Sequence, residues 1–144
     1  MRLIDEIIEL RILLSYVSDG FSVEDASKST PLTTRIKVLF LLEQKDFSPS
    51  ELIDIVGIAK SNLANLLKSM IRDGVVVSYK AENNSKNIFY TITESGLNEL
   101  KAYKDTATSE FEKRCEIPDD MCKKFQKIIE LLEGNLKWLN YIIV

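Results

Sequence analysis

The feature that most constrains the fold is the order of patterns between Ser48 and Gly96. A short amphipathic segment is followed by a turn, a longer amphipathic segment and two β-prone runs separated by a polar loop. Apolar residues recur at helical spacing in the first two segments and alternate in the last two. This order predicts two helices joined by a tight turn and followed directly by a β-hairpin.

Capping residues define the first of these helices. Ser48 occupies an N-cap position, and Pro49 stands at the first helical position, where its missing N–H costs nothing. Glu51 completes a capping box, in which each side chain is expected to accept a hydrogen bond from the backbone N–H of the other residue. Gly57 is expected to end the helix in a left-handed conformation.

The second helix is expected to start near Lys60 and to have two different faces. Its apolar stripe is formed by Leu63, Leu66, Leu67, Met70 and Ile71. The opposite face is polar and contains no acid before Asp73; it comprises Ser61, Asn62, Asn65, Lys68, Ser69 and Arg72. Asparagine pairs with adenine edges, and lysine and arginine bind phosphate or guanine. Taken alone, such a face is more often an ordinary solvated surface.

The segment that follows changes this interpretation. Residues 75–80 and 87–92 are β-prone, and the polar loop Ala81–Lys86 separates them. A hairpin directly after the second helix predicts a winged helix-turn-helix, in which the helix enters the major groove of DNA and the wing contacts a neighbouring groove or the backbone. Thr93 is expected to cap the next helix.

The stretch SELIDIVGIAKSNLANLLKSMIRDGVV, followed by YTITESG, resembles the MarR family of bacterial transcriptional regulators. The resemblance covers the middle third of the chain closely and the outer thirds in helical character only. It implies a dimeric regulator of double-stranded DNA, modulated by a small-molecule effector held between the dimer helices and the winged lobe. It also implies recognition-helix contacts from Lys60, Ser61, Asn62, Asn65 and Lys68, and a wing contact from Lys86.

Pattern and resemblance together give one set of candidate DNA-binding residues. The set is Lys60, Ser61, Asn62, Asn65, Lys68, Arg72, Lys80, Ser85 and Lys86. The family's wing tip commonly has an acid followed by two arginines. In this chain the corresponding residues are Asn84, Ser85 and Lys86. Lysine lacks the planar fork of arginine, so we expect weaker insertion into a narrow groove. Ala59 also replaces a common capping serine.

Charge is distributed unevenly along the chain. The formal net charge is −3, which counts against nucleic-acid binding as a global property. The segment from Lys60 to Tyr90, however, contains five basic and two acidic residues, so its formal charge is +3. DNA responds mainly to charges within about a Debye length, roughly 8–10 Å. We therefore expect modest non-specific binding to DNA. The alternative function is that of a winged-helix module that docks a protein and does not bind DNA.

Apolar residues are in excess at both ends of the chain. The first helix contains Ile4, Ile7, Ile8, Leu14 and Val17, and the last contains Phe125, Ile128, Ile129, Leu132, Leu136, Leu139 and Ile143. Burial within the monomer is one explanation, but a two-fold homodimer is favoured because it supplies two DNA half-sites.

The expected fold is mainly α. It is a single MarR-like domain over 1–144, with a winged helix-turn-helix lobe at 30–100, a two-stranded β-wing, and dimerisation helices at 1–18 and 119–144. LTTRIKVLFLLEQK is expected to be a buried helix behind the helix-turn-helix.

Several function classes are excluded or disfavoured by composition. The 144 residues include no histidine, so no imidazole base, nucleophile partner or metal ligand exists. No enzyme activity, cofactor or metal is expected. Cys115 and Cys122 cannot close a zinc site by themselves; we interpret them as partly buried thiols, and a redox role is the less favoured alternative. The absence of a signal peptide and of a membrane span predicts a cytoplasmic protein. No effector-binding residue is assigned, because Tyr16, Phe40 and Tyr103 fit a core equally well.

Overall fold

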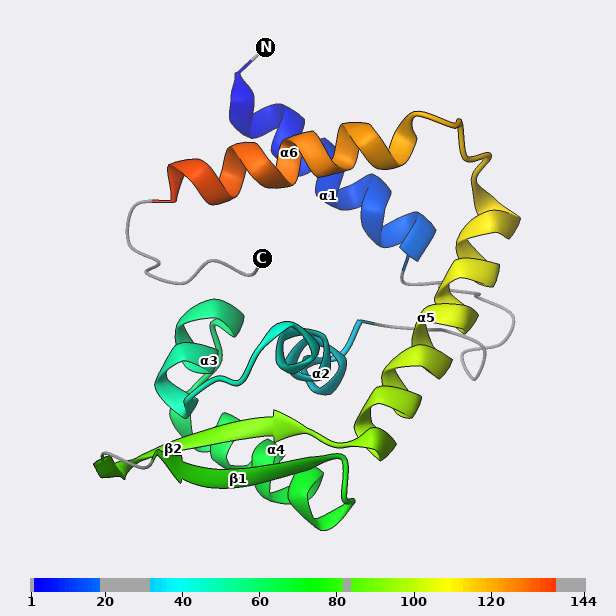
Figure 1. The fold of residues 1–144 in the computed structure, drawn as a ribbon. Helices are drawn as coiled ribbons and strands as arrows, with labels where there is room; N and C mark the ends of the chain where they lie inside the picture. Colours follow the sequence, from blue (N-terminus) through cyan, green and yellow to red (C-terminus); the bar gives the residue numbers. More distant parts are fainter. Residues whose placement is uncertain (1, 19–31, 82–83, 137–144) are drawn as a thin grey trace. The chain divides into compact units, whose positions relative to one another are not determined.

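The computed structural model describes residues 2–18, 32–81 and 84–136. Six helices and a two-stranded antiparallel sheet occur in these ranges, so the prediction of a mainly α winged-helix fold is confirmed (Figure 1). In chain order they are α1 (Leu3–Ser18), α2 (Thr34–Gln44), α3 (Pro49–Val56), α4 (Lys60–Arg72), β1 (Val76–Ala81), β2 (Asn84–Ile92), α5 (Glu94–Arg114) and α6 (Met121–Asn135).

The chain divides into two compact units. One comprises Met1–Thr33 and Lys101–Pro118, and the other comprises Thr34–Leu100 and Asp119–Val144. The predicted domain boundaries stay a prediction. Residues 19–31, between α1 and α2, lie outside the described residues.

The core of the winged lobe is built around α2. Five residues of this helix are buried: Ile36, Val38, Leu39, Leu41 and Leu42. The helix contacts α3 on one side and β2 on another. Because its apolar residues are nearly continuous, α2 can pack against several elements at once. The prediction of a buried helix behind the helix-turn-helix is confirmed.

The caps of α3 follow the sequence closely, with one difference. The Ser48 hydroxyl oxygen accepts a hydrogen bond from the Glu51 backbone N–H at 3.3 Å, as expected of an N-cap. The hydroxyl also donates to the Glu51 carboxylate at 3.1 Å, so the carboxylate binds the Ser48 side chain in place of the predicted backbone N–H. Gly57 has a φ of 73° and ends the helix in the left-handed conformation, as predicted.

The hairpin is longer at its tip than predicted. Regular pairs run from Val76 with Ile92 to Lys80 with Ile88, and Ala81 then pairs with Asn84. The register therefore shifts, and residues 85–87 form a bulge in β2. The prediction of an Ala81–Lys86 loop was wrong at both ends, because a bulge lets polar residues continue a strand without regular pairing.

In the unit formed by Met1–Thr33 and Lys101–Pro118, α1 interacts with the end of α5. The Arg114 guanidinium lies 5.9 Å from the centre of the Tyr16 ring, and it donates a hydrogen bond to the Tyr16 carbonyl oxygen at 3.1 Å. Most apolar side chains of α1 are nevertheless exposed, including Leu3, Ile4, Ile7, Ile8, Ile12 and Leu13.

Helix α6, described by itself, buries none of its side chains. Its exposed apolar residues include Ile128, Ile129, Leu131 and Leu132. The predicted positions Leu139 and Ile143 lie outside the described residues. Both long terminal helices thus have apolar surface that is exposed to solvent in the single chain.

Three further observations concern the cysteines, potential metal ligands and membrane-spanning helices. Cys115 is half-buried and Cys122 is exposed, and both are free thiols. Within residues 2–18, 32–81 and 84–136, no group of three or more potential metal ligands occurs. None of the helices described for this chain is long and apolar enough to cross a membrane.

Candidate nucleic-acid interface

Helix α4 separates its polar and apolar residues as predicted. Leu63, Leu67 and Met70 are almost fully buried, with exposed fractions of 1%, 2% and 0%. The candidate residues on the opposite face are all exposed: Lys60, Ser61, Asn62, Asn65, Lys68 and Arg72. The predicted apolar stripe was too wide, since Leu66 is only half-buried and Ile71 is 41% exposed. Only one row of side chains, spaced at i, i+4 and i+7, faces the core.

The amino-terminal end of α4 is not capped by a side chain. Ala59 is extended at the N-cap and makes no side-chain cap hydrogen bond. The first backbone N–H groups of the helix therefore keep their hydrogen-bonding capacity, and the helix dipole adds a partial positive charge at the same end. Lys60 adds a full charge to this end, so the region attracts anions.

The wing brings a second set of candidate residues near the helix-turn-helix. Lys80 and Lys86 are both exposed, and Ser85 lies in the bulge of β2. A groove of about 570 Å³ runs between the start of α3, the start of α4 and the strand β2. Lys60 and Lys86 both line this groove. The structure therefore places one candidate residue from α4 and one from the wing in the same groove.

The wing is fixed to the helix-turn-helix by a residue that the sequence analysis did not single out. Phe47 forms an isolated antiparallel bridge with Tyr90 of β2 and is completely buried. A signal was present in the sequence, because Phe47 precedes the N-cap Ser48 and Leu52 follows at the fourth helical position. That spacing is typical of a hydrophobic staple, in which the two apolar residues pack together.

Contacts of aromatic side chains stiffen the wing and the segment before α3 further. The Tyr79 hydroxyl donates a hydrogen bond to the Asp46 carboxylate at 2.5 Å, which raises the pKa of Tyr79. The Tyr79 ring stacks on Phe89 with centroids 5.9 Å apart and an angle of 24° between the planes. The Lys45 ammonium lies 4.9 Å from the centre of the Phe47 ring. The Asp46 contact ties the segment before α3 to β1, and the Tyr79–Phe89 stacking joins β1 to β2.

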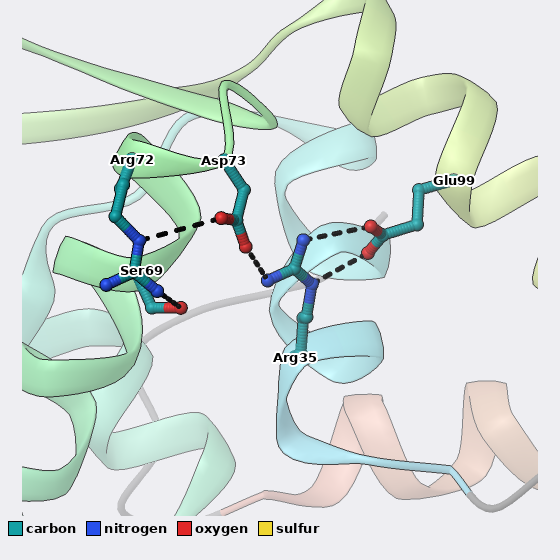
Figure 2. Close-up of polar contacts among 5 residues, drawn as sticks. All are labelled: Arg35, Ser69, Arg72, Asp73 and Glu99. Carbon is teal, nitrogen blue, oxygen red and sulfur yellow. Dashed lines mark hydrogen bonds and ion pairs between the residues drawn. The ribbon is translucent and has the colours of Figure 1, made fainter.

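Polar side chains at the end of α4 are joined to α2 and α5 by Arg35 (Figure 2). The Arg35 guanidinium donates to both carboxylate oxygens of Glu99 at 2.8 and 2.9 Å, and to the Asp73 carboxylate at 2.7 Å. The hydrogen bond from Arg35 is the main reason that the pKa of Asp73 lies below its usual value, and Glu99 and Asp73 raise the pKa of Arg35.

Arg72 belongs to the same group of side chains. Its Nε lies 3.7 Å from the other Asp73 oxygen, and its Nη2 is within 3.3 Å of the Ser69 hydroxyl. Sequence reasoning missed Arg35 and Glu99. No local signal could have paired them, because Arg35 is 38 residues from Asp73 and 64 from Glu99.

Comparisons with known proteins bear on the fold. Neither protein-family models nor curated proteins match this sequence significantly. Among solved structures, the transcriptional regulator PA4135 superposes with a TM-score of 0.67 at 15% identity, over 95% of this chain and 99% of that one. Wild-type MarR from E. coli, in its apo form, gives 0.63 at 13% identity over 92% and 96%. The transcriptional regulator Tm0710 from Thermotoga maritima gives 0.58 at 20% identity over 92% and 94%.

The chain has the MarR-type winged-helix fold. Identities of 13–20% establish the fold alone. In this MarR-type fold, α3 and α4 form the helix-turn-helix and the β1–β2 hairpin is the wing.

Proposed function

We propose that this chain is a sequence-specific, DNA-binding transcriptional regulator that acts as a homodimer. The observation that carries the proposal is the exposed face of α4, which has no acidic residue from Lys60 to Arg72. Its opposite face is buried by Leu63, Leu67 and Met70, so the polar face is held towards solvent. A rigid helix with a neutral-to-basic face suits the major groove of DNA.

The side chains on this face divide into two roles. Asn62 and Asn65 are short amides, which suit bidentate hydrogen bonds to adenine edges. Lys60 and Lys68 suit phosphate contacts, which fix the register of the helix in the groove. Lys80 and Lys86 extend the phosphate contacts along the wing. We therefore assign sequence discrimination to the two asparagines and general affinity to the lysines.

The homodimer is supported by the exposed apolar surface of α1 and α6. Leu3 is 70% exposed and Ile12 64%, and on α6 Leu131 is 59% and Leu132 60% exposed. Large exposed apolar patches commonly mark protein–protein contacts. A two-fold dimer would present two recognition helices to half-sites about one helical turn of DNA apart.

A small-molecule effector and a cytoplasmic location are also part of the proposal. The effector follows from the MarR resemblance, and the unit that contains α1 offers a wide-open, shallow apolar cavity of about 270 Å³, lined by Ala107, Thr108 and Phe111 of α5 and by Ile117. Such a cavity suits a small apolar group. No catalytic step is proposed, since the chain contains no histidine and its role is binding.

The direct test is electrophoretic mobility of the DNA upstream of the chain's own coding sequence, at about 50 and 200 mM salt. We expect a retarded complex that weakens steeply at the higher salt concentration. Lys68→Ala should weaken the complex, while Lys101→Ala, which removes an exposed lysine from α5, should not. A complex that is absent at both salt concentrations would contradict the proposal.

A protein-docking role is the second candidate function. The net charge of −3 and the wing without arginine favour it, as does the exposed outer face of β1, where Val77 is 47% and Tyr79 44% exposed. The same mobility measurement separates the two, because a docking module would leave every duplex unretarded even at low salt.

A further inference from the structure

We infer that Arg35 is a positioning residue for DNA binding, because it holds the Asp73 carboxylate and thereby leaves Arg72 available to a DNA phosphate. The inference rests on the proposed DNA-binding function and assigns a role to a residue that lies outside the recognition face. Arg35 is on α2, whereas Asp73 and Arg72 are at the end of α4 (Figure 2).

The distances show which arginine holds the carboxylate. One Asp73 oxygen lies 2.7 Å from Arg35 Nη1, the length of a strong charge-assisted hydrogen bond. The other oxygen lies 3.7 Å from Arg72 Nε, which is too long for a hydrogen bond. The two arginines therefore share one acid unequally, and Arg72 is the more weakly bound partner.

The Arg72 side chain is accessible to a phosphate of bound DNA. The Arg72 side chain is 77% exposed and lies at the end of the polar face of α4, whereas the Arg35 side chain is 26% exposed. A guanidinium that is weakly held and well exposed can exchange its partner for a DNA phosphate. A guanidinium engaged by an adjacent carboxylate loses part of that attraction.

Charge balance explains why Arg35 is needed. The group contains two arginines, Arg35 and Arg72, and two acids, Asp73 and Glu99, so the formal charges cancel. Removal of Arg35 leaves Asp73 without its short hydrogen bond, and Arg72 is the nearest cation that the structure gives it. We expect Arg72 to close on Asp73 and one phosphate contact to be lost.

The chain offers a matched control for a purely structural role of Arg35. Two of the three hydrogen bonds of Arg35 go to Glu99 on α5, and only one goes to Asp73. Glu99→Gln removes the charge that holds Arg35 to α5 but leaves the Arg35–Asp73 contact in place. A variant that merely loosened the packing of α2 would behave like Glu99→Gln.

The experiment measures the salt dependence of binding to duplex DNA from upstream of the chain's own coding sequence. The variants are Arg35→Gln, Glu99→Gln, Asp73→Asn and the double variant Arg35→Gln/Asp73→Asn. For Arg35→Gln we expect the slope of log affinity against log salt to fall by about one, with an affinity loss on the order of tenfold near 0.1 M salt. Glu99→Gln and Asp73→Asn should keep the wild-type slope, and the double variant should recover it.

Three outcomes for the variants would overturn the inference. Equal slopes for Arg35→Gln and Glu99→Gln would show that Arg35 does not act through Asp73. A double variant that stays as weak as Arg35→Gln would show that the loss is structural. If Arg35→Gln does not fold, Asp73→Asn decides alone, because a slope that rises by about one would mean that Asp73 already masks Arg72. Wild-type protein that shows no salt-dependent binding would overturn the proposed function itself, before any variant is compared.

Discussion

Phe47 and Tyr90 exchange both of their backbone hydrogen bonds across an isolated bridge. The Phe47 N–H donates to the Tyr90 carbonyl at 3.3 Å, and the Tyr90 N–H donates to the Phe47 carbonyl at 2.9 Å. Phe47 immediately precedes the N-cap of α3, and Tyr90 lies in β2 of the wing. The bridge therefore joins the wing to the helix-turn-helix, so that the proposed DNA-binding residues on the two elements keep a fixed spacing.

Phe47→Ala should reduce the free energy of unfolding by about 3–5 kcal/mol, the usual cost of removing a buried phenylalanine ring. Urea unfolding followed by circular dichroism gives this quantity. Phe40→Ala is the matched control, since Phe40 is 42% exposed while Phe47 is fully buried. An equal loss in both variants would contradict the central place of Phe47 in the core.

The two helical glycines Gly96 and Gly134 should respond in opposite directions to alanine. A Cβ on Gly96 would collide with the Val75 carbonyl oxygen and would lie 2.7 Å from the Ile92 side chain. A Cβ on Gly134 would meet nothing within 4 Å. Gly96→Ala should therefore lower the midpoint of thermal unfolding, and Gly134→Ala should raise stability by up to about 1 kcal/mol. A gain in stability from Gly96→Ala would contradict the observed packing of α5 on the hairpin.

Features set by neighbouring residues were predictable from the sequence. Ser48, Pro49 and Gly57 fixed the bounds of α3 through capping and a left-handed turn. Thr93 was expected to cap the next helix, and its hydroxyl oxygen accepts a hydrogen bond from the Gly96 N–H at 3.1 Å. Such signals act within one helical turn, so they can be recognised without knowledge of the fold.

Features that join distant segments were not predictable in the same way. The Arg35 contacts to Asp73 and Glu99 depend on how α2, α4 and α5 pack, and no local pattern encodes that packing. The bulge in β2 depends on the pairing register with β1, which polar residues specify poorly. The DNA-binding roles of Asn65 and Lys86 stay predictions, because they concern contacts with a molecule outside the chain.

Leu132→Glu should convert the proposed dimer into monomers, because it places a charge in the exposed apolar surface of α6. Light scattering at tens of micromolar protein, a concentration chosen so that a specific interface stays associated, should show the mass fall from two chains to one. Gln126→Glu adds the same charge to another exposed position on α6 and should leave the dimer intact. A molar mass of one chain for the wild-type protein would contradict the dimer proposal.

Lys86→Ala should weaken binding to every DNA sequence to the same degree. The proposed contact of Lys86 is with phosphate, so its loss should reduce the slope of log affinity against log salt by about one. Fluorescence anisotropy over a series of salt concentrations measures the slope, with Lys101→Ala as the control. An unchanged slope would remove Lys86 from the interface.

Sequence discrimination by Asn65 is the most direct test of the central claim that α4 reads DNA. The measurement compares the affinity of wild type and Asn65→Ala for the upstream duplex and for a scrambled duplex at one salt concentration. Asn98→Ala, an exposed amide on α5, is the control. We predict that wild type prefers the upstream duplex and that Asn65→Ala loses about 1–3 kcal/mol on that duplex alone. Equal affinities of wild type and Asn65→Ala for both duplexes would contradict the claim.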